Sequence, residues 1–217
     1  SLFKGPTGDI WVGSVTGLLR LSKRGFKRIK GTDGQLNLII RAILEEKDGT
    51  VWVGTQFGLY QLQNDKLQRV AESPVSKTEV KALLLDHEGS LWVGSDAGLA
   101  LLTKASWECS VLGNEIATRM VTALAQDSHG AIWIGVANPG TVFRIVGNHV
   151  FQYRQKDGLP PGVVNKFLVD REDSMWIGNS ARGLHQLRPG RAVKVASPEI
   201  SIGALPIVPD GAGGIWT

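Results

Sequence analysis

Short apolar runs separated by turn residues recur along the chain, and the stretch around Trp52 shows their spacing clearly. Its β-rich runs cover residues 40–45, 51–54, 59–63 and 66–70. Lys47-Asp48-Gly49 and Asn64-Asp65 lie between runs and favour tight turns. Helices would need windows of ten or more residues with a 3.6-residue period, and the sequence has none. The pattern therefore predicts a four-stranded antiparallel sheet.

Six of the seven tryptophans recur at nearly constant spacing, with intervals of 41, 40, 41, 43 and 40 residues. They are Trp11, Trp52, Trp92, Trp133, Trp176 and Trp216. Their neighbours repeat with them, as in GTVWVGTQFGLYQL, GSLWVGSDAGLALL and DSMWIGNSARGLHQL. Twelve residues before four of these tryptophans a second block begins, which reads IRAILEE, VKALLLD, VTALAQD and VNKFLVD. The whole stretch is therefore the repeating unit.

A period near 40 residues is typical of solenoids and propellers, and four short strands per repeat favour the propeller. One such sheet cannot bury both faces, so neighbouring sheets must stack around an axis. We predict an all-β fold, a β-propeller of four-stranded antiparallel blades of about 41 residues. We expect residues 1–217 to form a single propeller region with about five blades and a partial unit at Trp216.

The ends of the sequence favour a fragment of a longer propeller. We expect the first repeat to start at its turn, Gly5 to Gly8, with no innermost strand before it. The run 204–209 could supply that strand, but residues 214–216 would then duplicate residues 9–11. An open array exposes strand edges and apolar faces, so we expect this chain to associate with a second copy.

The repeated residues have a structural explanation. A large flat tryptophan in the second strand can fill the wedge between adjacent sheets, and the glycine two residues later leaves room for close approach. We assign this structural role to Trp11, Trp52, Trp92, Trp133, Trp176, Gly54, Gly94, Gly135 and Gly178. The repeated acidic residues and glycines, as in Asp86-His87-Glu88-Gly89, satisfy tight turns, so they predict turns and not catalysts.

Departures from the repeat identify candidate ligand contacts. After Trp133 and Trp176 the next loop glycine comes one residue later than in the first three repeats, and Asp173 replaces a turn glycine. In a propeller the loops joining the second and third strands ring the central funnel, and loops on a rigid scaffold commonly carry function. We therefore predict ligand contacts at Gln56, Asp96, Asn138, Asn179 and Arg182.

Composition narrows the classes of function. The net charge is +4, and the only basic cluster is Lys23, Arg24, Lys27, Arg28 and Lys30. We interpret this cluster as a solvated face and predict no nucleic-acid binding. The single cysteine can neither form an internal disulfide nor complete a thiolate metal site. No run approaches the roughly 20 apolar residues that span a bilayer, and the N-terminus lacks a signal-peptide pattern.

Catalytic and cofactor motifs are absent from the sequence. The four histidines, at positions 87, 129, 149 and 185, fall in predicted turns or outer strands without metal-ligand spacing. There is no nucleophile elbow, phosphate loop or dinucleotide fingerprint, so we predict no catalytic residue, metal or cofactor. A propeller enzyme can assemble its site from several blades, however, so a lyase or lactonase-type enzyme stays open as an alternative.

Units of the form V-x-A-L-x-x-D-x-x-G-x-x-W-V-G-S-x-x-G-L-x-x-L closely resemble the two-component regulator propeller repeat. In that family such repeats build the extracytoplasmic sensor region of bacterial membrane receptors, which a transmembrane helix couples to a histidine kinase or diguanylate cyclase. The resemblance implies a non-catalytic, periplasmic sensor of a small-molecule or oligosaccharide ligand. It implies membrane attachment only through segments absent from this chain. A protein-interaction scaffold is the main alternative.

Overall fold

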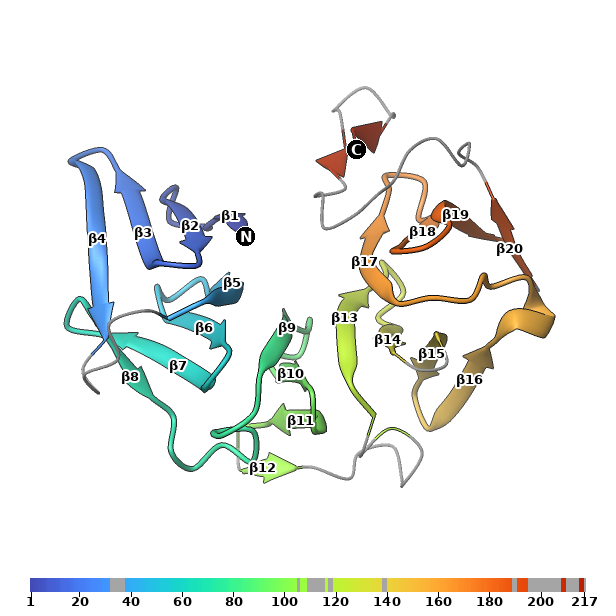
Figure 1. Ribbon diagram of the computed structural model, residues 1–217, viewed down its shortest axis with the longest axis horizontal. Helices are drawn as coiled ribbons and strands as arrows, with labels where there is room; N and C mark the ends of the chain where they lie inside the picture. Colours follow the sequence, from blue (N-terminus) through green and yellow to red (C-terminus); the bar gives the residue numbers. More distant parts are fainter. Residues whose placement is uncertain are drawn as a thin grey trace. The chain divides into compact units, whose positions relative to one another are not determined.

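The computed structural model describes residues 1–31, 38–104, 106–108, 116, 119–137, 140–188, 191–194, 208–209 and 215–216. These residues are predominantly β-strand, which confirms the predicted all-β class (Figure 1). They belong to two compact units, Ser1–Val111 and Leu112–Thr217, which we describe separately. The single propeller region over residues 1–217 stays a prediction.

The first two repeats join into one eight-stranded sheet in the order β1-β2-β3-β4-β8-β7-β6-β5. Its strands are β1 (Leu2–Lys4), β2 (Ile10–Ser14), β3 (Gly17–Ser22), β4 (Gly25–Gly31), β5 (Ile40–Glu45), β6 (Val51–Thr55), β7 (Gly58–Gln63) and β8 (Lys66–Arg69). Strands within a repeat pair antiparallel in sequence order. The outer strands β4 and β8 pair in parallel, residues 30–31 with 66–67. Two four-stranded repeats are therefore joined at their outer strands (Figure 1).

The third repeat forms a four-stranded sheet of its own. Its strands are β9 (Val80–Leu85), β10 (Leu91–Ser95), β11 (Gly98–Leu102) and β12 (Trp107–Glu108). One prediction was wrong, because the first repeat does have an innermost strand, β1, whose Leu2 pairs with Val12. This strand is only three residues long, too short to stand out as an apolar run. The four strands predicted around Trp52 are confirmed to within one residue at each end.

The second compact unit holds two further four-stranded sheets. The fourth repeat has β13 (Val121–Gln126), β14 (Ile132–Val136), β15 (Thr141–Val146) and β16 (His149–Tyr153), followed by the 3₁₀ helix η1 (Gln155–Asp157). The fifth has β17 (Val164–Val169), β18 (Met175–Asn179), β19 (Gly183–Arg188) and β20 (Arg191–Lys194). Finally β21 (Val208–Pro209) pairs with β22 (Ile215–Trp216). Val208 pairs with Trp216 as Leu44 pairs with Trp52, so these strands begin a sixth repeat.

In three repeats the glycine two residues after the tryptophan lets the next repeat approach closely. In three repeats a Cβ on this glycine would lie within 2.8 Å of the first side chain of the next innermost strand. The pairs are Gly13 with Ile40, Gly54 with Val80, and Gly135 with Val164. Gly94 and Gly178 hold the same position in β10 and β18. The tryptophans of the first four repeats are buried, with at most 8% exposed.

In the second to fifth repeats a carboxylate in the turn before the tryptophan strand holds the indole ring. Glu46, Asp86, Asp127 and Asp170 accept the Nε1–H of the tryptophan six residues later at 2.6, 2.7, 2.9 and 2.7 Å. The first repeat has Gly5 at this position, and Trp11 donates instead to Glu45 Oε2 of β5 at 3.1 Å. A side chain on Gly5 would overlap that carboxylate. The repeated acids thus fix the tryptophans as well as the turns.

Candidate functional site

The loops joining the second and third strands lie beside the residues that lead into the innermost strands. Gln56 Oε1 accepts the backbone N–H of Ile39 at 2.6 Å. In the third repeat the N–H of Asp96 donates to the carbonyl of Glu79 at 3.0 Å. Ala137 and Ser180 make the corresponding bond in the fourth and fifth repeats. This end of each repeat therefore brings loop residues to the start of its innermost strand.

Four innermost strands, β5, β9, β13 and β17, have a β-bulge at their second residue. A bulge leaves one residue unpaired in the ladder and re-aims its side chain, which is why bulges are common beside active sites. The bulge residues are Arg41, Lys81, Thr122 and Asn165. The first compact unit therefore has cations at these bulges, and the second has neutral side chains.

Four charged side chains meet at the bulges of the first unit, and we name Arg41, Glu79, Lys81 and Asp96 the bulge cluster. Arg41 Nε lies 2.5 Å from Glu79 Oε1, and Lys81 Nζ lies 2.8 Å from Glu79 Oε2. Lys81 Nζ also lies 3.3 Å from Asp96 Oδ1. Side-chain exposure ranges from 19% for Glu79 to 46% for Arg41, so the cluster is open to a ligand.

The bulge cluster has no net charge, because two cations face two carboxylates. Burial raises the pKa of Glu79, but hydrogen bonds from Lys81 and Arg41 outweigh burial and hold the pKa below its ordinary value of 4.5. Its carboxylate is therefore ionised at neutral pH. The cluster presents strong donors and acceptors side by side, which suits a polar ligand that carries both kinds of group.

Neutral residues take the matching positions in the second unit. Thr122 Oγ1 lies 2.6 Å from the carbonyl oxygen of Val164 in the next repeat and 3.1 Å from that of Gly135. Met120 and Val163 stand where the third repeat has Glu79. In this unit the bulge hydroxyl therefore joins two repeats through backbone contacts.

The structure places the predicted ligand contacts in different surroundings. Asp96 belongs to the bulge cluster, whereas Gln56 holds the backbone before β5. Asn179 is fully buried, and its Oδ1 accepts the N–H groups of Ala181 and Arg182 at 2.9 and 3.2 Å. Arg182 is exposed on the same loop, and Asn138 lies outside the described residues. Their role as ligand contacts stays a prediction.

The loop of the fourth repeat differs from the sequence interpretation. Thr55 pairs with Gly58, which leaves two loop residues, and Asn179 pairs with Gly183, which leaves three. Val136, however, pairs with Thr141, so four sequence positions separate the paired residues of β14 and β15. The extension in this repeat is two residues and not one, because Gly140 precedes the first paired residue of β15.

Sequence reasoning missed Arg41, Glu79 and Lys81. The blocks IRAILEE and VKALLLD predict strands by their repetition, which assigns no separate role to their second residues, Arg41 and Lys81. The available signal was a change of chemistry at that one position, from basic in two repeats to Thr122 and Asn165 in the next two.

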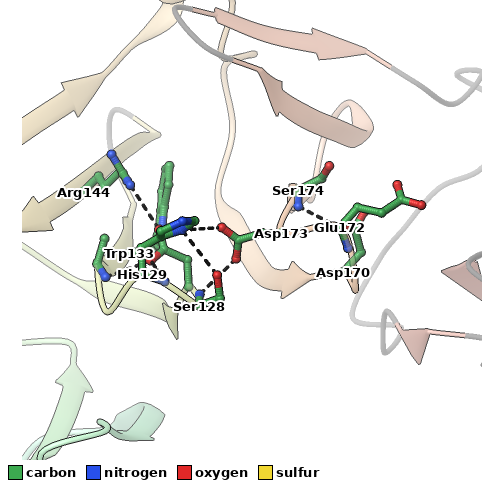
Figure 2. Close-up of polar contacts among 10 residues, drawn as sticks. Ser128, His129, Trp133, Arg144, Asp170, Glu172, Asp173 and Ser174 are labelled. Carbon is green, nitrogen blue, oxygen red and sulfur yellow. Dashed lines mark hydrogen bonds and ion pairs between the residues drawn. The ribbon is translucent and has the colours of Figure 1, made fainter.

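Asp173, which replaces the turn glycine of the other repeats, contacts the neighbouring repeat (Figure 2). It adopts a φ of 60°, in the left-handed region, and its Oδ1 accepts the N–H of Ser128 at 2.9 Å. Its Oδ2 lies 2.7 Å from His129 Nδ1, which is also 3.3 Å from Ser128 Oγ. Backbone hydrogen bonding by Ser128 lowers the pKa of Asp173. A Ser-His-Asp relay needs the hydroxyl and the carboxylate on opposite ring nitrogens, so this trio is not arranged as one.

The prediction that the histidines lie in turns or outer strands is confirmed for two of the remaining three. His87 lies in an exposed turn and His149 begins the outer strand β16, as predicted. His185 lies instead in the third strand, β19, and is 3% exposed. Within the described ranges no group of three or more His, Cys, Asp or Glu residues could hold a metal ion. A search of the same residues found no helix long and apolar enough to cross a membrane.

The comparison with protein families gives one match, over residues 34–57, to the family described as "Two component regulator propeller". These 24 of the 217 residues therefore match a two-component regulator propeller repeat. This confirms the resemblance predicted from the sequence, and the matched segment contains β5, β6, Arg41 and Gln56. A comparison with curated proteins found no match.

Solved structures share the fold at low sequence identity. The extracellular domain of BT3049 from B. thetaiotaomicron, described as a hybrid two component system, is 20% identical with a TM-score of 0.67, over 86% of this chain and 26% of that one. Virginiamycin B lyase from Staphylococcus aureus is 14% identical with a TM-score of 0.71, over 88% and 67%. PorZ, a surface component of the type-IX secretion system of Porphyromonas gingivalis, is 16% identical with a TM-score of 0.62, over 94% and 34%.

These likenesses show a fold of the β-propeller type and nothing about activity. The repeat scaffold of this chain therefore matches β-propellers, among them an extracellular domain of a hybrid two component system and a lyase. The chain spans about a quarter of the length of the BT3049 domain that it matches.

Proposed function

We propose that this chain is part of a ligand-sensing, extracytoplasmic β-propeller of a bacterial signal-transduction receptor, and that it is not itself catalytic. The observation that carries the proposal is the family match over residues 34–57, because that family is named for two-component regulators. The proposal includes about five four-stranded blades from a longer propeller. It places the chain in the periplasm, with a kinase or cyclase output in other segments of the receptor.

The bulge cluster is the proposed ligand contact. It lies where loops and innermost strands meet, it is partly exposed, and it offers cationic donors beside carboxylate acceptors. A small polar ligand with several hydroxyl groups, such as an oligosaccharide, could exchange bonds with both kinds of group. Arg41 also lies inside the segment that matches the family.

A thermal-shift screen against oligosaccharides and small metabolites tests the proposal. A ligand at 100 times its Kd stabilises the folded state by about 2.7 kcal/mol and should raise Tm by several degrees. The variants Arg41→Gln and Lys81→Gln should lose most of this ligand-induced shift. Lys47→Gln, an exposed lysine in the turn between β5 and β6, is the matched control and should keep it.

Other outcomes point to the alternatives. Loss of the shift in the Lys47→Gln control as well would mean that the bulge cluster is not the ligand contact. A screen without any shift would contradict the sensor proposal and favour the protein-interaction scaffold. The likeness to a lyase extends to the fold alone, so we do not propose an enzyme.

We also propose that the chain associates with a second copy. Large apolar side chains are exposed on β15 and β16 of the second unit, where Val146, Val150 and Phe151 are 39%, 47% and 49% exposed. Burying such side chains against another chain is favourable. Light scattering that finds only a monomer at high protein concentration would contradict this.

A further inference from the structure

An open groove of about 800 Å³ lies on the first compact unit, and none of the bulge cluster residues lines it. Its walls are the turn between β1 and β2, the hairpin of β3 and β4, and Asp65 in the turn between β7 and β8. The groove is therefore formed mainly by the first repeat, with Asp65 contributed by the second. Small-ligand sites commonly enclose about 300–1,000 Å³, so this groove has room for a small molecule.

The charged side chains of the groove leave a positive excess. The cations are Arg20, Lys23, Arg24 and Lys27, and the acids are Asp9 and Asp65. Four cations against two acids give a formal charge of +2 (4 − 2). A concave surface with one excess charge concentrates ligands of the opposite sign.

Both acids already have cationic partners. Arg20 Nε lies 2.7 Å from Asp9 Oδ2, and its guanidinium lies 5.2 Å from the centroid of the Trp11 ring. Lys27 Nζ lies 2.6 Å from Asp65 Oδ2, and this hydrogen bond lowers the pKa of Asp65. Arg20 Nη1 reaches Asp65 only at 3.9 Å. Arg20 is therefore held in place by Asp9 and Trp11, with one side of its guanidinium weakly engaged.

Lys23 and Arg24 supply the excess charge. Both are exposed at the tip of the hairpin, and within the part of the chain that the structure describes neither has a carboxylate within 4.0 Å. The hairpin itself is well defined, because Ser22 Oγ accepts the N–H of Arg24 at 3.2 Å and Gly25 adopts a φ of 101°. Two exposed cations thus line the same groove as a guanidinium that is already oriented.

We propose that this groove binds a small anionic ligand through a phosphate or carboxylate group, held by Lys23 and Arg24 with Arg20 as the preorganised third cation. Hydrogen bonds from Arg and Lys to oxyanions are short and about twice as strong as neutral ones. The site shares no residue with the bulge cluster, so it does not depend on the sensor proposal.

Titration of the chain with inorganic phosphate or citrate, followed by backbone amide NMR shifts, tests the site. Sodium chloride keeps the ionic strength constant, because exposed charges are screened by salt. We expect saturable shifts confined to residues 7–9, 20–27 and 65. The tighter of the two probes identifies phosphate or carboxylate as the favoured group. Shifts that do not saturate, or that spread over all exposed lysines, would overturn the proposal.

Two variants should change the affinity in opposite directions. Lys23→Gln combined with Arg24→Gln removes the excess charge and should weaken binding about tenfold, whereas Asp65→Asn removes a competing acid and should tighten it about two- to fivefold. Asparagine tolerates the φ of 59° at this position, so the turn is preserved. Lys47→Gln is the control. It removes one positive charge outside the groove, as each of the two substitutions removes one inside it. Equal affinity in all variants, or weakening in the control as well, would overturn the proposal.

Discussion

The two compact units have the same repeat scaffold but different chemistry at the bulges of their innermost strands. In both units a carboxylate accepts a hydrogen bond from the tryptophan indole, and a glycine allows the next repeat to pack closely. At the bulges, however, Arg41 and Lys81 share the carboxylate of Glu79, whereas Thr122 bonds to a backbone carbonyl. The same strand position can therefore hold a charged residue of a partly exposed cluster, or a neutral residue that hydrogen-bonds to the next repeat, without any change of fold.

In each unit an aspartate with a left-handed backbone conformation forms a side-chain hydrogen bond with a residue of the neighbouring repeat, but the partner differs. Asp65 has a φ of 59° and pairs with Lys27, and Asp173 has a φ of 60° and pairs with His129. Aspartate tolerates this conformation better than most residues with a side chain, although it costs more than glycine would. The contacts between repeats offset that cost, which explains why Asp173 replaces a glycine that the other repeats retain.

The largest expected loss of stability comes from replacing a turn acid. Comparing Asp127 with Asp86 tests whether the turn acids of the two units contribute equally to the free energy of unfolding. Asp127 is 4% exposed and accepts side-chain hydrogen bonds from Trp133 and Arg144. Among the described residues, Asp86 accepts a side-chain hydrogen bond from Trp92 and has no arginine partner. Asp127→Asn should therefore cost about 3 kcal/mol of unfolding free energy and Asp86→Asn about 1–2. Urea unfolding followed by tryptophan fluorescence measures both.

A second variant at the same site provides the control. Arg144→Met combined with Asp127→Asn removes the arginine that would otherwise lose its carboxylate. The combined cost should fall below the sum of the two single costs, because the side chains are in contact. Equal costs for Asp127→Asn and Asp86→Asn would show that Arg144 adds nothing to the turn.

Replacing the glycine of the tryptophan strand by alanine should lower the free energy of unfolding equally in both units. Alanine at Gly54 would place its Cβ 2.7 Å from Val80 Cγ1, and alanine at Gly135 would place it 2.8 Å from Val164 Cγ1. Each substitution should lower the unfolding free energy by about 1–3 kcal/mol, since extra atoms in a packed interface force side chains and backbone to shift. Val80→Ala should partly rescue Gly54→Ala. A cost below about 0.5 kcal/mol at either glycine would disprove the close approach inferred there.

The repeat made the scaffold predictable from the sequence, since strand lengths, turns and the packing role of tryptophan and glycine follow from local patterns. The short β1 was missed because three residues give no pattern. The pairing of β21 with β22 agrees with the partial repeat expected at Trp216. The contacts within the bulge cluster could not be predicted, because its residues come together only through a bulge and a contact between two repeats. Asn179 illustrates the converse, since a polar loop residue proved to be fully buried.

The smallest expected effect concerns the pH dependence of the bulge cluster. The pKa of Glu79 is lower in the folded protein than its ordinary value of 4.5, so its ion pairs stabilise the fold above about pH 4.5 and are lost as the pH falls through the folded value. Glu79→Gln should therefore cost under about 1 kcal/mol at pH 7, because its partners are partly exposed, and less at lower pH. Urea unfolding at several pH values between about 3 and 7 measures this difference.

Thr122→Val supplies the contrasting measurement in the second unit. It removes a hydroxyl that has no charge, so its cost, about 1 kcal/mol, should not change over the same pH range. If the cost of Glu79→Gln were equally independent of pH, the carboxylate would contribute no more than a neutral hydrogen bond, and the chemical difference between the two units would have no energetic consequence. If the cost of Glu79→Gln declines as Glu79 is protonated, ionic contacts hold the cluster together. A charged or highly polar ligand can replace such contacts, whereas it cannot replace the hydrogen bond from Thr122 to a backbone carbonyl.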